Sequence, residues 1–270
     1  MTDSSSLTPV APNEKLVCLM AHGACEFIAT LLLLMTVMGG FAWLIAPLGE
    51  SSLQTGLLAA LVGVVIALIA RSPMGKLSGA HMNPAISMAF WMQGRLELRE
   101  LMVYVLMQFG GAITACGLLS ALLPTQFQEI GFGVLSPVPD ANVVRILVLE
   151  GGATAGLVVV MFYTLSHKNL TQYAAVSIAA YLTVITFLLA PLTGASLNPA
   201  RAFGAAVVAH QWEGQWPYWL APLLGATAAT VVHRLVIWLP QPLYHRLNHS
   251  HLHSNYTWSA LQRLRRNWQQ

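Results

Sequence analysis

Two asparagines, each followed by Pro and Ala, are the residues best suited to do chemistry in this chain. Asn83 lies in the phrase SGAHMNPA at 78–85, and Asn198 lies in the similar phrase TGASLNPA at 193–200. Asn is a favoured helix N-cap, and Pro at the first helical position lacks only an N–H that would have no partner there. Each phrase therefore predicts a turn and then a helix start, with a side-chain amide at the tip that can donate hydrogen bonds.

Apolar runs follow both phrases, and each is too short to cross a membrane alone. At 1.5 Å per residue, the helices expected at 84–93 and 199–209 would each be about 15 Å long. The hydrocarbon core of a bilayer is about 30 Å thick. Two such half-helices, one from each half of the chain, could cross it together and meet near its middle.

The composition is that of an integral membrane protein. Of the 270 residues, 56% are hydrophobic and 9% are charged, whereas soluble proteins average about 25% charged residues. The net charge of +3 is too small to indicate nucleic-acid binding. Cys18, Cys25 and Cys116 lie in or beside apolar runs and are expected to behave as small hydrophobes. The polar start of the chain lacks the basic and apolar regions of a cleavable signal peptide.

Six longer apolar runs predict an all-α membrane protein with six transmembrane helices. They cover about 16–46, 53–70, 101–123, 143–165, 173–190 and 216–239. The runs are too long, and alternate too little, to be the strands of a β-barrel. We divide the chain into a polar N-terminal tail (1–13), a first repeat (14–123), an extracellular linker (124–141), a second repeat (142–240) and a His/Arg-rich cytoplasmic tail (241–270).

The two halves share motifs beyond the asparagine phrases. Glu26 and Glu150 each stand four residues before a Thr, and Gln108 and Pro222 each stand three residues before a Gly-Ala pair. Because each half has three spans, an odd number, the second half must enter the membrane from the opposite side, which gives an inverted repeat. Lys and Arg concentrate in segments that are cytoplasmic if both termini are inside. We expect a multi-pass protein of the plasma membrane, or of the inner membrane in a bacterium.

Half-helices that meet at their N-termini would bring together two positive dipole ends, each equivalent to about half an elementary charge. A cation or a hopping proton would meet an electrostatic barrier at this point. Non-helical backbone at such a depth must line a polar cavity, and its carbonyls would offer hydrogen-bond acceptors. Small neutral hydrogen-bonding molecules suit this lining, whereas ions do not, since no ring of charge is present.

These motifs together resemble the aquaporin, or major intrinsic protein, family over about 26–239: the paired Asn-Pro-Ala, the Ser-Gly-Ala-His lead-in, the Arg after the second motif and the Glu-x-x-x-Thr pairs. The family implies a six-span channel with two re-entrant half-helices, assembled as a homotetramer with one pore per subunit. The resemblance places Asn83 and Asn198 at the pore waist and Arg201 in the outer constriction. Glu26 and Glu150 would brace the re-entrant loops rather than relay protons. His81 would line the inner vestibule, and the remaining expected pore-lining residues are Ala80, Met82, Ser196 and Leu197.

The family sorts solutes largely at a constriction of four residues. Besides Arg201, counting back from the second motif gives Thr186 and Ala195. The fourth filter position lies in the second span. It falls on Val62 if the lead-in to the first motif is one residue longer than usual, and on Gly63 otherwise. None of these residues is aromatic, so the filter is expected to be wider than that of a strict water channel.

Other markers resemble the water-selective branch of the family instead. Ala202 stands where glycerol-conducting relatives usually have Asp, and Tyr218-Trp219 stands where they usually have Pro and an aliphatic residue. Because pore width acts directly on passage, we give the filter more weight. The sequence thus predicts a passive channel for water and small uncharged solutes such as glycerol, urea or neutral metalloid hydroxides (arsenous acid, for example).

Two alternatives remain at this point, a strict water-selective aquaporin and an inverted-repeat secondary transporter, which would need a coupling-ion site. An enzyme is not expected, because no Ser or Cys has an evident base partner and no cluster has metal-ligand spacing within the spans. Within the spans, the sequence therefore implies no bound metal or cofactor. The tail carries His245, His249, His251 and His253, which could bind a metal or sense pH, although a solvated tail is the simpler interpretation. Residues 261–268 could lie on the membrane surface as a basic amphipathic segment.

Overall fold

A computed structural model describes residues 12–135 and 142–237 of the chain. The end of the expected linker, the C-terminal tail with its histidines and basic segment, and all but the last residues of the N-terminal tail lie outside these ranges. Within them the secondary structure is entirely helical, with no strand. The expectation of an all-α chain therefore holds for the part that the structure describes.

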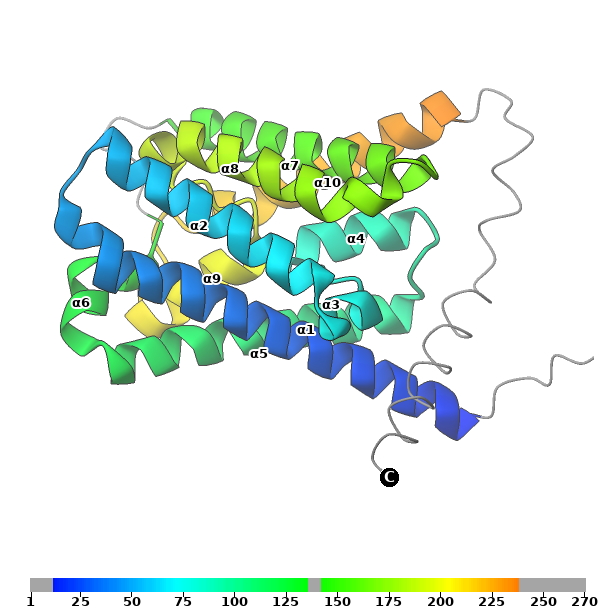
Figure 1. Ribbon diagram of the computed structural model, residues 1–270, viewed down its shortest axis with the longest axis horizontal. Helices are drawn as coiled ribbons and strands as arrows, with labels where there is room; N and C mark the ends of the chain where they lie inside the picture. Colours follow the sequence, from blue (N-terminus) through cyan, green and yellow to red (C-terminus); the bar gives the residue numbers. More distant parts are fainter. Residues whose placement is uncertain (1–11, 136–141, 238–270) are drawn as a thin grey trace, which may run out of the picture.

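Six long helices run along the same direction of the molecule (Figure 1). They are α1 (Pro12–Gly40), α2 (Ser52–Arg71), α5 (Leu98–Leu122), α7 (Val143–Ser166), α8 (Ala174–Thr193) and α10 (Trp216–Ile237). In the described part of the chain, five segments are long and apolar enough to cross a membrane: Lys15–Leu48, Ser52–Arg71, Leu98–Leu122, Val143–Ser166 and Thr171–Thr193. The sixth expected span corresponds to α10, which has 22 residues and packs along α7.

Four shorter α-helices lie between them: α3 (Pro73–Ser78), α4 (Pro84–Met92), α6 (Pro124–Glu129) and α9 (Pro199–Ala209). A π-helical turn at Phe41–Ile45 and 3-10 turns at Ala46–Leu48, Gly131–Gly133 and Thr171–Tyr173 complete the described structure. Helices α4 and α9 are the two half-helices expected after the asparagine phrases. Each begins at the predicted proline, with Asn83 or Asn198 as its N-cap. They are nine and eleven residues long, so together they span about 30 Å.

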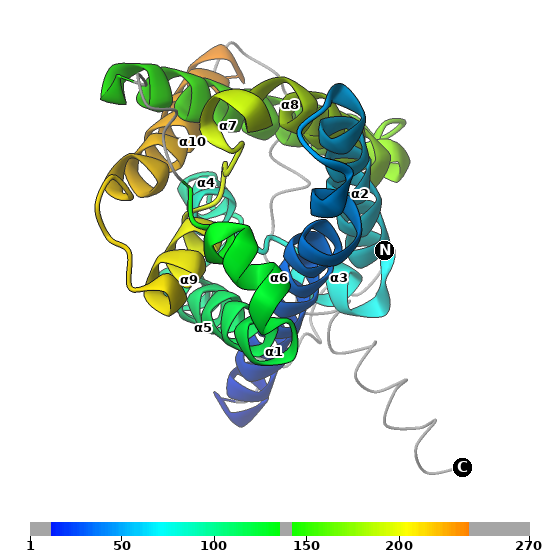
Figure 2. The same ribbon diagram turned by 90° about the vertical axis from the view of Figure 1, so that its left-hand side faces the viewer.

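The packing follows the repeat in the sequence. Helix α1 packs on α5, and the corresponding helices of the second half, α7 and α10, pack on each other. Each half-helix also crosses to the other half, since α9 packs on α5 and α4 packs on α10. Figure 2 shows the consequence end-on: the long helices form a ring, and α4 and α9 lie on one side of it beside α5 and α10.

Two glycines of the repeated motifs permit these close helix contacts. A Cβ at Gly111 on α5 would lie 2.5 Å from the carbonyl oxygen of Phe27 on α1. A Cβ at Gly225 on α10 would collide with the carbonyl oxygen of Gly151 on α7. Small residues at equivalent positions let both helix pairs approach backbone to backbone, as is common in membrane bundles.

The segment after α5 is more ordered than the expected linker. After α6, the chain makes a 3-10 turn at Gly131–Gly133 and lies back on the bundle. Phe127 and Leu135 are both buried there, and the Gln215 side chain donates a hydrogen bond to the Leu135 carbonyl at 2.8 Å. This part of the linker is thus a packed cover, held by two apolar anchors and a buried amide.

Candidate functional site: the meeting point of the two half-helices

The two predicted waist asparagines hold the half-helices together tip to tip. Asn83 donates from Nδ2 to the Leu197 carbonyl at 2.8 Å, and Asn198 donates from Nδ2 to the Met82 carbonyl at 2.7 Å. Their Oδ1 atoms accept from the backbone N–H groups of Ala85 and Ala200 and so cap their own helices. Each Asn therefore caps its own helix through Oδ1 and donates one N–H of its amide group to the opposite loop. Because an amide nitrogen carries two hydrogens, a second N–H remains for another partner.

The loops that lead to the asparagines have an unusual backbone that is the same in both halves. Ala80 and Met82 have φ angles of 51° and 50°, and Ala195 and Leu197 have φ angles of 47° and 50°. For residues other than Gly, such left-handed conformations cost about 1–3 kcal/mol each and persist only where the surroundings impose them. This strain was not predicted from the sequence, and its cause lies in the buried carboxylates.

Each loop is fixed by one fully buried glutamate. Glu150 accepts from the Thr193 hydroxyl (2.6 Å) and from the backbone N–H groups of Ser196 (3.1 Å) and Leu197 (2.7 Å). Glu26 accepts from the corresponding groups of the first half, the Ser78 hydroxyl (2.7 Å) and the N–H groups of His81 (3.0 Å) and Met82 (2.7 Å). Hydrogen bonds to a carboxylate are about twice as strong as neutral ones. The two carboxylates thus tie the loops to the long helices α1 and α7.

The first brace has a fourth donor that the second lacks. Gln108 on α5 donates from Nε2 to Glu26 at 2.8 Å and to the Ser87 hydroxyl at 2.9 Å, and Ser87 in turn contacts Nδ1 of His81 at 3.1 Å. The equivalent residue of the second half is Pro222, which has no side-chain donor. From the sequence, Gln108 is recognised only as part of a repeated motif, and no role is predicted for its side chain.

His81, the expected vestibule residue, is buried among aromatic rings. Its ring centroid lies 4.5 Å from that of Phe90 and 5.3 Å from that of Tyr104. The Tyr104 hydroxyl donates to the Ser78 carbonyl at 2.7 Å. The imidazole is therefore held from three sides, by two rings and by Ser87.

Arg201 leaves the first turn of α9 and reaches the segment after α6. Its Nη1 donates to the Gly133 carbonyl at 2.8 Å. The local sequence does not predict this partner, because Gly133 lies 68 residues away in the segment 124–141, which is expected to be a linker. Of the other expected filter residues, Thr186 is buried on α8, and Ala195 is half-buried in the loop before α9.

The two candidates for the second-span filter position differ clearly in surroundings. Gly63 is buried against α8: a Cβ there would collide with the Thr183 hydroxyl and lie 3.0 Å from the Ala179 carbonyl oxygen. Val62 is half-buried one position earlier on α2. Gly63 is therefore a helix-packing residue.

The site as a whole offers polar groups without a free carboxylate. Both buried glutamates are engaged by three or four donors, and the N-terminal ends of α4 and α9 face each other. In residues 12–135 and 142–237, no three His, Cys, Asp or Glu side chains lie close enough together to hold a metal ion. Such an arrangement can hydrogen-bond small neutral molecules, and its positive helix ends oppose cations.

Comparison with known proteins agrees with this architecture. A family model described as major intrinsic protein matches residues 15–233. The probable aquaporin PIP1-4 of Arabidopsis thaliana is 32% identical over 238 residues, which cover 80% of this chain and 78% of that protein. Nodulin-26 of Glycine max is 32% identical over 182 residues, covering 67% of this chain and 65% of that protein.

Among solved structures, the X-ray structure of the aquaglyceroporin from Plasmodium falciparum superimposes with a TM-score of 0.72. The match covers 81% of this chain and 97% of that chain at 19% sequence identity, so it shows the shared fold. The family match over residues 15–233 identifies the protein as a multi-pass membrane channel. The chain belongs to the major intrinsic protein family, which includes the aquaporins.

Proposed function

We propose that this protein is a passive channel for water and small uncharged solutes, such as glycerol, urea or neutral metalloid hydroxides including arsenous acid. The observation that carries the proposal is the absence of an aromatic residue at the filter formed by Val62, Thr186, Ala195 and Arg201. Because three of these side chains are small or aliphatic and none is a ring, we expect the constriction to admit molecules larger than water.

The choice of Val62 for the second-span position is supported by the geometry of α2. Leu57, Val64 and Leu68 are 41%, 57% and 66% exposed, so they mark the outer face of this helix. At 100° per residue, Val62 lies roughly 120° to 160° around the helix from all three. Its side chain is accordingly directed to the interior of the bundle, while Gly63 is turned to α8.

Ions and protons are excluded by the meeting point of the half-helices. A water or solute molecule there can accept a hydrogen bond from the second N–H of Asn83 or Asn198, and its own O–H groups can donate hydrogen bonds to nearby loop carbonyls. Ala80, His81, Met82, Ser196 and Leu197 continue the lining on either side of the waist. The facing positive ends of α4 and α9 raise the energy of a cation at this point.

The filter is tested by narrowing it. We expect Val62→Phe combined with Thr186→His to abolish glycerol and urea flux in proteoliposomes, while water flux continues, because the added rings fill the constriction. The matched control is Val64→Phe, the same exchange two residues further along α2 at a position that is 57% exposed. Glycerol flux that is unchanged in the double variant, measured by stopped-flow light scattering, would contradict the filter assignment.

A strict water-selective channel is the second candidate. It is favoured by Ala202 and Tyr218, both fully buried, which differ from the residues usual in glycerol-conducting relatives. Water flux without any glycerol, urea or metalloid flux would establish it. A secondary transporter is less well supported, because Glu26 and Glu150 are fully engaged as braces and are not available to couple an ion. Saturable, gradient-coupled uptake of a solute would be the signature of such a transporter.

We further propose a homotetramer in the plasma membrane, or in a bacterial inner membrane, with both termini in the cytoplasm. Large apolar side chains are exposed on α2 and α8, among them Leu68, Val184 and Leu188. Neighbouring subunits can cover this surface. A mass of four chains for the detergent-solubilised protein, measured by light scattering with correction for detergent, would support the assembly, and a mass of one chain would contradict it.

A further inference from the structure

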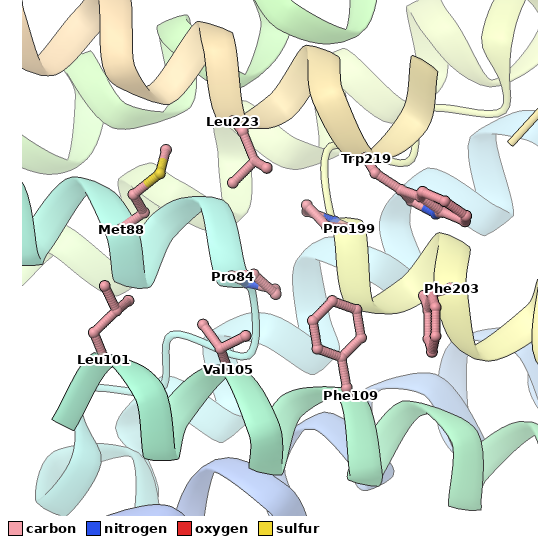
Figure 3. A pocket seen from close by; sticks show the side chains of 9 residues that line it. All are labelled: Pro84, Met88, Leu101, Val105, Phe109, Pro199, Phe203, Trp219 and Leu223. Carbon is pink, nitrogen blue, oxygen red and sulfur yellow. The ribbon is translucent and has the colours of Figure 1, made fainter. Parts of the chain in front are cut away.

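A second feature of the fold lies behind the half-helices and has no place in solute passage. It is a groove of about 350 Å³ between α5 and α10, floored by α4 and α9, and every side chain that lines it is apolar. Figure 3 shows Val105 and Phe109 of α5 facing Leu223 and Trp219 of α10 across it. Its volume is within the range of small-molecule binding sites, about 300–1,000 Å³.

The groove lies at the middle of the membrane. Its floor includes Pro84 and Pro199, the first residues of α4 and α9. These prolines directly follow the two asparagines that join the half-helices. Because each half-helix covers about half of the hydrocarbon core, their meeting point is near the bilayer midplane.

Three aromatic rings lie together at the α9 end of the groove (Figure 3). The ring centroids of Phe109 and Phe203 are 4.9 Å apart, and those of Phe203 and Trp219 are 5.7 Å apart. Both pairs have the steeply inclined geometry that aromatic rings favour. These three rings form the wall of the groove at the α9 end.

The groove adjoins an exposed apolar surface formed by α5 and α10. On α5, Met102 and Leu106 are 58% and 68% exposed, and on α10, Leu220 and Leu224 are 40% and 54% exposed. In a membrane channel of this family, exposed apolar side chains at this depth contact acyl chains or another subunit. The residues lining the groove are immediate neighbours of these four along the same helices.

From its depth, its lining and the exposed apolar surface beside it, we propose that the groove binds the acyl chain of one bilayer lipid. Apart from the buried indole N–H of Trp219, the walls offer water no hydrogen-bond partner. An empty apolar groove also forgoes the dispersion contacts that hydrocarbon supplies. A chain entering between α5 and α10 would lie on Pro84 and Pro199 and fill the space behind the waist. The site is independent of which solute the pore conducts.

Photolabelling of the full-length protein tests this directly. The probe is a phosphatidylcholine with a diazirine near the methyl end of one acyl chain, mixed into phosphatidylcholine vesicles that contain the protein. After irradiation, peptide mapping should find adducts on Phe109, Phe203 or Leu223 at several times the yield on Leu106, although Leu106 is the more exposed side chain. Labelling that simply follows exposure, or that spares the groove and Leu106 alike because another subunit covers them, would overturn the proposal.

A pair of variants provides a second test. Val105→Phe places a ring in the groove and should reduce adducts at Phe203 and Leu223 several-fold. Leu106→Phe makes a similar change one residue further along α5, outside the groove, and should leave those adducts unchanged. Equal groove labelling in both variants would overturn the proposal. If Val105→Phe does not fold, the comparison of groove with Leu106 labelling in the unaltered protein still decides.

Discussion

Replacing Glu150 by Gln should detach the second re-entrant loop from the bundle. The exchange keeps the shape of the side chain but turns one carboxylate oxygen into an NH₂ group. If the remaining oxygen keeps the Thr193 hydroxyl and the Ser196 N–H, the new NH₂ faces the Leu197 N–H, which donates to Oε2 at 2.7 Å in the unaltered protein. A donor then opposes a donor in a fully buried site.

The size of the effect follows from these contacts. Losing a hydrogen bond to a charged acceptor costs about 1.5–3 kcal/mol, and leaving a buried N–H without a partner costs about 1–3 kcal/mol. The left-handed residues Ala195 and Leu197, each strained by about 1–3 kcal/mol, then drive the loop to relax. We expect a net destabilisation of the loop of about 3–5 kcal/mol, which changes its open-to-closed equilibrium by a factor between roughly 10² and 5 × 10³.

The assay combines water permeability of proteoliposomes with the thermal unfolding midpoint in detergent. Water permeability and the unfolding midpoint should both fall, because the relaxed loop loses the hydrogen bond from Asn198 to the Met82 carbonyl that joins the two half-helices. Thr164→Val is the matched control on the same helix, since the Thr164 hydroxyl bonds only to backbone carbonyls of α7, at 2.8 and 3.1 Å. Wild-type permeability and midpoint in Glu150→Gln, or losses no greater than in Thr164→Val, would refute the bracing role.

Two further changes probe the waist and the α2–α8 contact. Asn198→Asp replaces the donor to the Met82 carbonyl by an oxygen and adds a negative charge between two positive helix ends. The proton leak, followed with a pH-sensitive dye inside the vesicles, should therefore rise several-fold. A leak equal to that of the unaltered protein would count against the electrostatic barrier. Gly63→Ala should lower the unfolding midpoint by an amount equivalent to about 1–3 kcal/mol, because the new methyl group collides with the Thr183 hydroxyl. Adding Thr183→Ala should restore part of the loss, and no recovery would show that the strain lies elsewhere.

The elements that local chemistry determines were predictable from the sequence. The half-helices begin at Pro84 and Pro199 as expected, because an Asn cap and a Pro at the first position specify a helix start within a few residues. Glu26 and Glu150 stood out because carboxylates in apolar runs are rare.

The contacts that depend on distant segments were not predictable. Gly133 and Arg201 stand 68 residues apart and meet only because the linker lies back on the bundle. The left-handed φ angles of Met82 and Leu197 run against the preference of these residue types. They persist because the glutamates hold the N–H groups of these two residues. Likewise, the rotation of α2, on which the choice between Val62 and Gly63 depends, is set by its packing on α8 and not by the spacing along the chain.

Under the proposed function, the waist and filter pass small neutral molecules but not protons. This selectivity is tested most directly by measuring glycerol, water and proton fluxes in one preparation of proteoliposomes that contain the unaltered protein. We predict glycerol and water permeabilities well above those of protein-free vesicles, with proton permeability no higher than theirs. Glycerol permeability at the protein-free level would contradict the wide filter, and proton permeability above that level would contradict the barrier at the meeting of the half-helices.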